Sequence, residues 1–275
     1  MRMAAQGCLP AAFAAWPQHP LYRSLAPWRD AAQFADWPRQ AEYDALLAHA
    51  RGCGQPLPAE LRFACDLAPA LYYEMHIGSS GEIPTRTQNW HDWFGALAWL
   101  SWPQSKLALN ARHVRAIERG ELGRGPFRDA ATLLDECGVI LPVSDDTLAA
   151  ALHAMDWQTL FQTRAADWGR HIDSHVLGHA LFEQGLAMHI GWCGKALLLP
   201  VAADFFALDY WQRQQQLDAS LAALLADDGW LSRPRQLLPL PLLGIPGWWQ
   251  PQDAAFYGNR DYFRPTRRAN SATLN

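Results

Sequence analysis

The feature that most limits the fold is a pair of adjoining amphipathic segments in the first half of the chain. After Asn89, apolar residues recur at the spacing of one helix face: Trp90, Trp93, Phe94, Leu97 and Leu100. Residues 104–119 carry a second stripe at the same spacing: Leu107, Ala111, Val114 and Ile117. Asn89 is suited to cap the first helix, since its side chain can accept a hydrogen bond from a free first-turn amide. Two consecutive helices, each with one apolar face to bury, predict a packed helical body.

The rest of the chain extends this pattern. We expect further helices over residues 41–51, 129–138, 144–155, 170–188 and 202–226, another that begins at Trp157, and a short strand-like run over 139–143. Prolines interrupt both ends of the chain. The predicted fold is therefore mainly α: one compact multi-helix domain over 1–275, with little or no sheet. It divides into an irregular Trp/Pro-rich arm (about 1–40), a helical body (41–236), an extended strap (237–268) and a tail (269–275).

The chain is rich in tryptophan, with 14 residues of this type against 11 Phe and 7 Tyr. Large aromatic side chains are usually buried, placed at an interface or used to hold a ligand. Trp90 and Trp93 follow helix periodicity, and others lie in the proline-broken arm and strap. This leaves Trp99 and Trp102, which lie off the main stripe, as the tryptophans predicted to line a site.

Charge and cysteine content exclude several classes of protein. Lys and Arg number 23 against 27 Asp and Glu, and a net charge of −4 gives no overall attraction to nucleic acid. The five cysteines are odd in number and have no C-x-x-C spacing, which argues against a disulfide framework or a zinc knuckle. No apolar run approaches the length of a membrane span. We expect a cytoplasmic protein with neither a membrane nor a nucleic acid as partner, and with an unknown small molecule or protein instead.

The strongest candidate site is a series of polar residues four apart: His171, His175, His179 and Glu183. On a helix over 170–188 these side chains would follow one face, each rotated about 40° from the last. Two histidines at i and i+4 can share one metal, as in the HExxH motif, although the glutamate of that motif is absent here. We predict a divalent metal such as zinc at His175, His179 and Glu183. The alternative is a His–Glu hydrogen bond that braces the helix.

Two further pairs are candidate catalytic groups. His91 and Asp92 are neighbours, about 100° apart on a helix, so both cannot face its apolar side. An adjacent His–Asp pair is typical of phosphohydrolase metal sites, whereas the structural alternative is an Asp that favours the first-turn dipole. Asn110 and His113 are three apart, and Asn110 falls within the apolar stripe. A buried amide without partners costs about 1–3 kcal/mol, so Asn110 either faces a pocket or ties two helices together.

Six blocks of sequence, in order along the chain, resemble one protein family. They are NWHDWFGALAWLSWPQSKLALNARH (89–113), LLDECGV (133–139), GHALFE (178–183), GKALLL (194–199), PLPLLGIPGWW (239–249) and FYGNRDYFRP (256–265). The chain resembles the bacterial family labelled domain of unknown function 3025 over about residues 20–268. The resemblance implies a bacterial protein of a single family and brings no activity or catalytic residue with it.

These observations favour three hypotheses for the function. The first is a metal-assisted hydrolase whose His, Asp and Glu side chains meet between helices, where a metal would activate water. The second is a non-catalytic module that binds a small molecule or peptide in a Trp-lined groove. The third is a protein-interaction role for exposed tryptophans. The first requires the segments around His91, His113 and His179 to converge.

Overall fold

The computed structural model describes residues 18–29, 31, 36–65, 67, 72–121 and 125–265. Within them the helices are α2 (Ala26–Arg29), α3 (Gln40–Gly52), α4 (Tyr73–Ser80), α5 (Trp90–Ser101), α6 (Pro103–Glu118), α7 (Pro126–Cys137), α8 (Asp146–His153), α9 (His179–Gln184), α10 (Tyr210–Leu225) and α11 (Ala254–Tyr257). The strands are β1 (Arg62–Ala64), β2 (Glu82–Pro84), β3 (Gly138–Val143), β4 (His175–Val176), β5 (Cys193–Pro200) and β6 (Leu238–Pro241). The part of the predicted arm before residue 18, the last three residues of the predicted strap and the predicted tail (269–275) lie outside the described residues.

The prediction of a mainly α fold with little or no sheet is wrong, because the chain has a mixed α/β fold. A four-stranded sheet runs in the order β4-β3-β5-β6, and β1 and β2 form a second, two-stranded sheet. β3 pairs parallel with β5, whereas β4 and β6 pair antiparallel with their neighbours. All six residues of β3 are buried. A short apolar run buried on both faces has no alternating pattern, so periodicity alone does not distinguish it from a buried helix segment.

The predicted C-terminal strap contains the edge strand of this sheet. β6 has the sequence Leu-Pro-Leu-Pro and pairs with β5, with Pro239 opposite Lys195. Proline has no N–H to donate, so it is tolerated in a sheet mainly at an edge. Only Leu238–Pro241 of the predicted strap is a strand, hydrogen-bonded into the sheet, and Ala254–Tyr257 within it form the helix α11.

The helix predicted over residues 170–188 is also wrong. His175 and Val176 form β4, and only residues 179–184 form the helix α9. The backbone N–H groups of Leu177 and Gly178 both donate to the carbonyl oxygen of Gly138, at 3.1 and 2.9 Å. This close approach of two backbone segments holds the chain in an extended conformation just before α9. The histidines four apart consequently do not share one helix face.

Gly178 is packed so tightly that no side chain fits there. A Cβ atom at this position would lie 2.5 Å from the backbone nitrogen of Gly138 and 2.6 Å from the carbonyl carbon of Cys137. We expect Gly178→Ala to lower the free energy of unfolding by about 2 kcal/mol or more, since a backbone neighbour cannot rotate away. Urea unfolding would measure this change. Gly52→Ala is the matched control, because nothing lies within 4 Å of a Cβ there, and equal stability of the two variants would contradict the prediction.

The two amphipathic helices form as predicted. Asn89 caps α5, and its side chain accepts a hydrogen bond from the backbone N–H of Asp92. α6 follows at once with Pro103 at its first position, where a missing N–H costs nothing. The predicted helix over 202–226 is shorter, since α10 begins only after Asp209, which forms its cap. No helix in the described part of the chain is long and apolar enough to cross a membrane.

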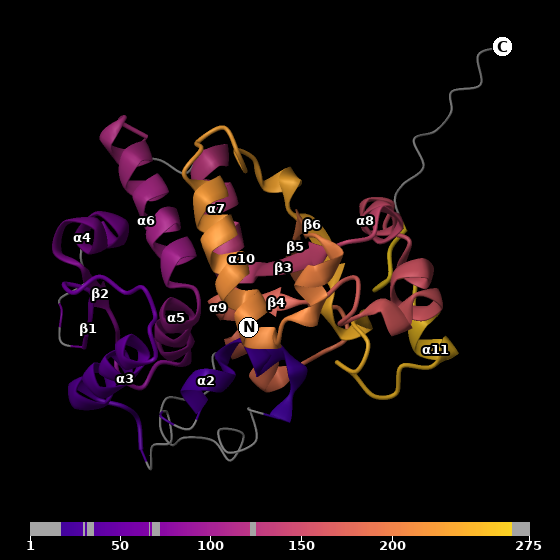
Figure 1. Cartoon of the computed structure of the whole chain (residues 1–275), viewed down its shortest axis with the longest axis horizontal. Coiled ribbons are helices and arrows are strands. Elements are labelled where there is room, and N and C mark those ends of the chain that lie inside the picture. The colour runs from indigo at the N-terminus through magenta and orange to yellow at the C-terminus, as the bar shows by residue number, and fades with distance from the viewer. Residues whose placement is uncertain are drawn as a thin grey trace.

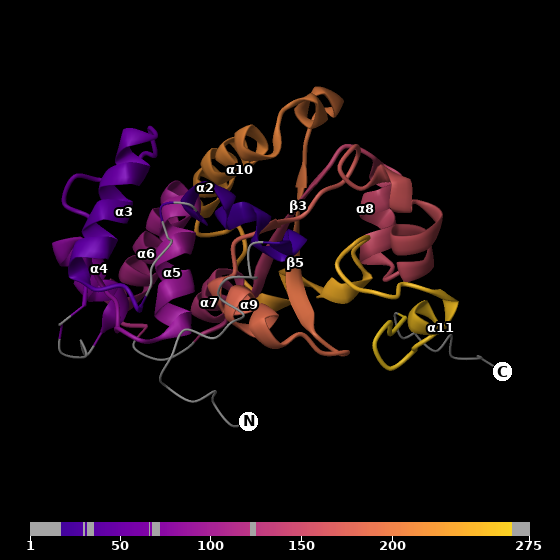
Figure 2. The ribbon, with the colours of Figure 1, turned by 90° about the horizontal axis from the view of Figure 1, so that it is seen from below.

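The elements form three groups along the long axis of the molecule. Figures 1 and 2 show α3, α4, β1 and β2 at one end, the four-stranded sheet with α7 and α9 near the centre, and α8 and α11 at the other end. α5 and α6 lie between the first group and the sheet (Figure 1). This arrangement brings α5, α7 and α9 together in the middle of the molecule.

Candidate metal centre

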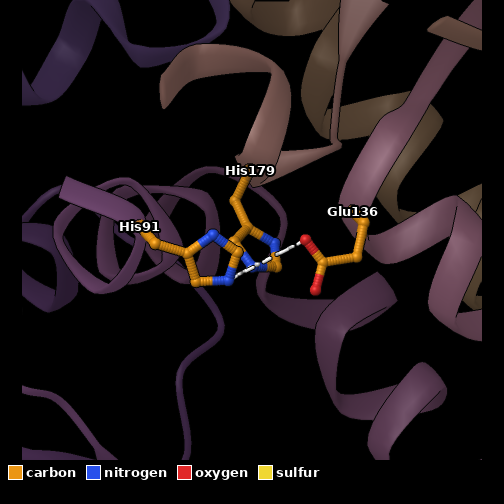
Figure 3. Close-up of side chains that lie close together, drawn as sticks. All are labelled: His91, Glu136 and His179. Atoms are coloured by element: carbon orange, nitrogen blue, oxygen red, sulfur yellow. Dashed lines mark hydrogen bonds and ion pairs between the residues drawn. The ribbon is translucent and has the colours of Figure 1, made fainter. Parts of the chain in front are cut away.

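Three side chains from three helices meet where α5, α7 and α9 come together. They are His91 in the first turn of α5, Glu136 in the last turn of α7, and His179 at the start of α9. Figure 3 shows the two imidazole rings close together and at an angle to each other, with the Glu136 carboxylate beside them. The Nε2 atoms of His91 and His179 are 3.0 Å apart. Oε2 of Glu136 lies 3.6 Å from Nε2 of His179 and 3.8 Å from Nε2 of His91.

These spacings match the requirements of a small divalent cation. Ligand bonds of about 2.0–2.2 Å to zinc place the donors of a tetrahedral site about 3.3–3.6 Å apart. The three donor separations in the structure are 3.0, 3.6 and 3.8 Å, so one is slightly shorter and one slightly longer than this range. A cation could therefore contact all three atoms with only small movements of the side chains.

The contacts of His179 turn its Nε2 lone pair toward the other two residues. Its Nδ1 lies 2.8 Å from the backbone carbonyl oxygen of Asp135, which can only accept a hydrogen bond. Nδ1 therefore carries the proton, and Nε2 in the neutral ring has a free lone pair. Burial lowers the pKa of His179 to about 4, so the ring is neutral at pH 7. A histidine held by a backbone carbonyl at one nitrogen, with the lone pair of the other directed at neighbouring polar groups, is typical of metal ligands, and here Nε2 contacts Nε2 of His91.

His91 is oriented in the same way by a carboxylate. Its Nδ1 lies 3.3 Å from Oε2 of Glu183, and this contact raises the pKa of His91. The carboxylate accepts a hydrogen bond from Nδ1, and the Nε2 atom of His91 is the one directed at His179. Glu183, predicted as a metal ligand, thus lies behind His91 rather than among the three donors. Its position suits an orienting partner of a ligand.

A cavity of about 610 Å³ opens beside the three residues, and all three line it. Its wall also includes Lys106 and His113 from α6 and Glu74 from α4. Burial raises the pKa of Glu74 to about 7, although hydrogen bonds from Asn110 act in the opposite direction. The three converging side chains are therefore part of the wall of a space large enough for a small molecule.

The other predicted site residues have different positions. Asp92 lines the cavity, but both of its carboxylate oxygens contact the guanidinium of Arg86, each at 2.8 Å. Asn110 donates to the backbone oxygen and to Oε2 of Glu74, at 2.9 and 2.7 Å, so it ties α6 to α4. Its amide ties the two helices together, one of the two predicted roles, and Asn110 also lines a second cavity between α4 and α6.

His175 lies away from the centre, contrary to the helix-based prediction. It is fully buried in β4, and its ring stacks on Tyr210 with centroids 4.1 Å apart. The two tryptophans expected to line a site also differ from each other. Trp99 lines the cavity, whereas Trp102 is fully buried and donates from Nε1 to the carbonyl oxygen of Val176.

Glu136 is the residue that sequence reasoning missed. It belongs to the pair Asp135–Glu136 in the last turn of α7, where the negative end of the helix dipole disfavours carboxylates. Two adjacent acidic residues at the C-terminal end of a helix indicate that cationic or metal partners lie nearby, and this is the signal that the sequence offers. In the structure Asp135 contacts Nζ of Lys106 at 2.5 Å, and Glu136 faces the two histidines.

Comparison with known proteins agrees with the resemblance noted in the sequence. Neither the curated proteins nor the solved structures contain a match to this chain. The model of one family, described as "Protein of unknown function (DUF3025)", matches residues 61–267. This range includes all three converging residues and every motif quoted above. The chain belongs to the DUF3025 family.

Proposed function

We propose that this protein binds a divalent metal ion of the zinc type at His91, Glu136 and His179 and uses it to hydrolyse a small molecule in the adjoining cavity. The observation that carries the proposal is the orientation of the two histidines. Each has Nδ1 on an acceptor, Glu183 or the Asp135 carbonyl, and each directs Nε2 to the same point. Two such histidines, with their Nε2 atoms 3.0 Å apart and a carboxylate beside them, are suited to share one cation.

The donor set favours zinc among common divalent ions. Two imidazole nitrogens and one carboxylate oxygen are the ligands of one class of catalytic zinc sites, in which the fourth position holds water or substrate. Hard ions such as Mg²⁺ and Ca²⁺ prefer an environment made of oxygen atoms. The cavity beside the three ligands provides room for that fourth position.

The residues around the ligands fit a hydrolytic role. A bound metal of this kind lowers the pKa of a coordinated water to about 7, which makes hydroxide available at neutral pH. Glu74, in the wall of the same cavity, has a pKa near 7 and can give or accept a proton at that pH. Glu183 and the Asp135 carbonyl hold the two rings in place, and Lys106 holds the Asp135 side chain.

Metal loading followed by a hydrolysis assay tests the proposal. We expect purified, untagged protein to bind about one equivalent of Zn²⁺, and the Co²⁺ form to show the visible absorption of a tetrahedral site. The zinc-loaded protein should hydrolyse at least one member of a panel of p-nitrophenyl esters and phosphates, and Glu136→Gln should abolish that activity. Absence of metal binding would contradict the proposal. If zinc bound tightly but no substrate of the panel were hydrolysed, the proposed metal centre would stand, and a binding module would be favoured over an enzyme.

Substitution of Asp92 tests whether this residue belongs to the metal centre. We expect Asp92→Asn to leave zinc affinity unchanged, because the Asp92 carboxylate contacts Arg86 and not the three donors. Competition with a chromophoric chelator would measure the affinity. A large loss would show that Asp92 belongs to the metal centre, as the adjacent His–Asp pair suggested.

A further inference from the structure

A second group of polar side chains lies in the same cavity and supplies none of the three proposed metal ligands. His113 and Lys106 come from α6, seven residues and about two turns apart, so they lie on the same side of the helix. Both line the cavity, and both are more than nine-tenths buried, with 5% and 6% of their surface exposed. Charged and polar side chains are seldom buried to this extent without partners.

His113 lacks the partners that a buried imidazole needs. Neither of its ring nitrogens has a hydrogen-bond partner within the described part of the chain, and Nδ1 is completely buried. A neutral imidazole has one N–H donor and one acceptor nitrogen. Leaving such a group unpaired costs about 1–3 kcal/mol. The ring forms part of the cavity wall, and a bound molecule can reach Nε2, the nitrogen that is not closed off.

Lys106, which lines the same cavity as His113, has N–H donors that its ion pair does not use. Its Nζ contacts Oδ1 of Asp135 at 2.5 Å and lies 5.2 Å from the centre of the Trp99 ring. An ammonium group has three N–H donors, and the Asp135 oxygen occupies one of them. The Trp99 ring stabilises the charge without accepting a conventional hydrogen bond. Lys106 can therefore donate to a ligand while it keeps its ion pair.

The charge of the cavity depends on the metal. Apart from Glu74, three cationic side chains and three carboxylates line the cavity and cancel one another: Arg86, Lys106, Arg128, Asp92, Asp135 and Glu136. A divalent ion at the three proposed ligands would make the cavity net positive. A cleft with one sign of charge concentrates ligands of the opposite sign.

We propose that His113 and Lys106 form a subsite that binds an anionic, oxygen-bearing group of the substrate, a carboxylate or a phosphate, while the bond to be hydrolysed lies at the metal centre. This inference rests on the proposed function for the positive charge of the cavity. The imidazole supplies a donor that currently has no partner, and the ammonium supplies the charge. The substrate is thus an anion with a hydrolysable bond outside its charged group.

Titration with small anions tests the subsite. Zinc-loaded and metal-free protein would be titrated with inorganic phosphate and with acetate, followed by calorimetry and by the histidine ring signals in ¹⁵N NMR. We expect phosphate, acetate or both to shift the His113 ring signals, and the stronger ligand identifies the anion class. His113→Leu and Lys106→Met should each weaken that binding about tenfold or more, the equivalent of one lost hydrogen bond to a charged group. His153→Leu, on the exposed end of α8, is the matched control and should bind as the wild type does.

The outcomes separate this subsite from the metal centre. Equal anion affinity in wild type and in both variants would mean that the anion binds elsewhere, for example on the zinc, and would overturn the subsite. Failure of both anions to bind would overturn it too. Zinc affinity is measured separately on each protein. If zinc fails to bind but the variants still weaken anion binding to the metal-free protein, the subsite stands and the proposed metal centre fails.

Discussion

His179→Ala is expected to lower the zinc affinity of the protein more than 100-fold. The substitution removes one of three protein donors, and loss of an outer partner of a ligand alone costs about 10–100-fold. The imidazole is nine-tenths buried, and its removal leaves two of the three converging donors. Competition with a chromophoric chelator would give the affinities. Zinc at 100 times its Kd should also raise the free energy of unfolding of the wild type by about 2.7 kcal/mol, and this gain should vanish in the variant.

Two further variants make the result specific. His171→Ala removes a histidine of the same sequence series that is exposed and contacts Ser144 instead, so its zinc affinity should equal that of the wild type. Glu183→Gln should give an intermediate loss of about 10–100-fold, because Glu183 orients His91 without being one of the three donors. If His179→Ala bound zinc as tightly as His171→Ala, the assignment of the ligands would be wrong.

Buried neutral histidines are expected to make the protein sensitive to mild acid. Burial lowers the pKa of His113 to about 4 and that of His175 to about 3, against 6.5 in the unfolded chain. As pH falls below 6.5, the unfolded chain takes up these protons and the folded protein does not. Each histidine therefore contributes full stability above pH 6.5, and this is lost as pH falls toward the folded values. Between pH 7 and pH 5 the loss is about 2 kcal/mol for each histidine and about 4 kcal/mol for both.

Histidine variants distinguish the effect of the histidines on acid stability from that of the carboxyl groups. Glu74 acts in the opposite direction, since its raised pKa makes folding more favourable as pH falls. The measurement is therefore the difference between urea unfolding free energies at pH 7 and pH 5, compared across proteins. We expect His113→Leu and His175→Leu each to reduce the acid loss by about 2 kcal/mol, whereas His153→Leu should leave it unchanged. Identical pH dependence in all four proteins would refute the prediction.

The helices were predictable from the sequence where local signals agreed. α5 has a capping asparagine, an apolar stripe and a following proline, and each of these acts within a few residues. The sheet was not predictable in this way, because its strands are short and their partners are distant in sequence. β3 and β5 pair across about 50 residues of chain. β6 carries two prolines that would exclude it from any place except an edge.

The candidate site was predictable only in part, for a related reason. The His91–Asp92 pair and the series of polar residues four apart point to His91 and His179, and the structure does bring these two together. The spacing of four between His175 and His179 was misleading, since the backbone contact at Gly178 ends the strand before α9 begins. Glu136 was missed because nothing local links the end of α7 to a histidine 43 positions later.

The contact between Gly138 and Gly178 has a consequence for how a metal would be captured. Glu136 lies two residues before one glycine, and His179 lies one residue after the other. Hydrogen bonds of the sheet thus fix the main chain that carries both ligands, whatever occupies the site. His91 comes from α5, whose main chain is not hydrogen-bonded into the sheet. The main chain of two of the three proposed ligands would thus be preorganised, and the conformational entropy lost on metal capture would fall mainly on His91 and its helix.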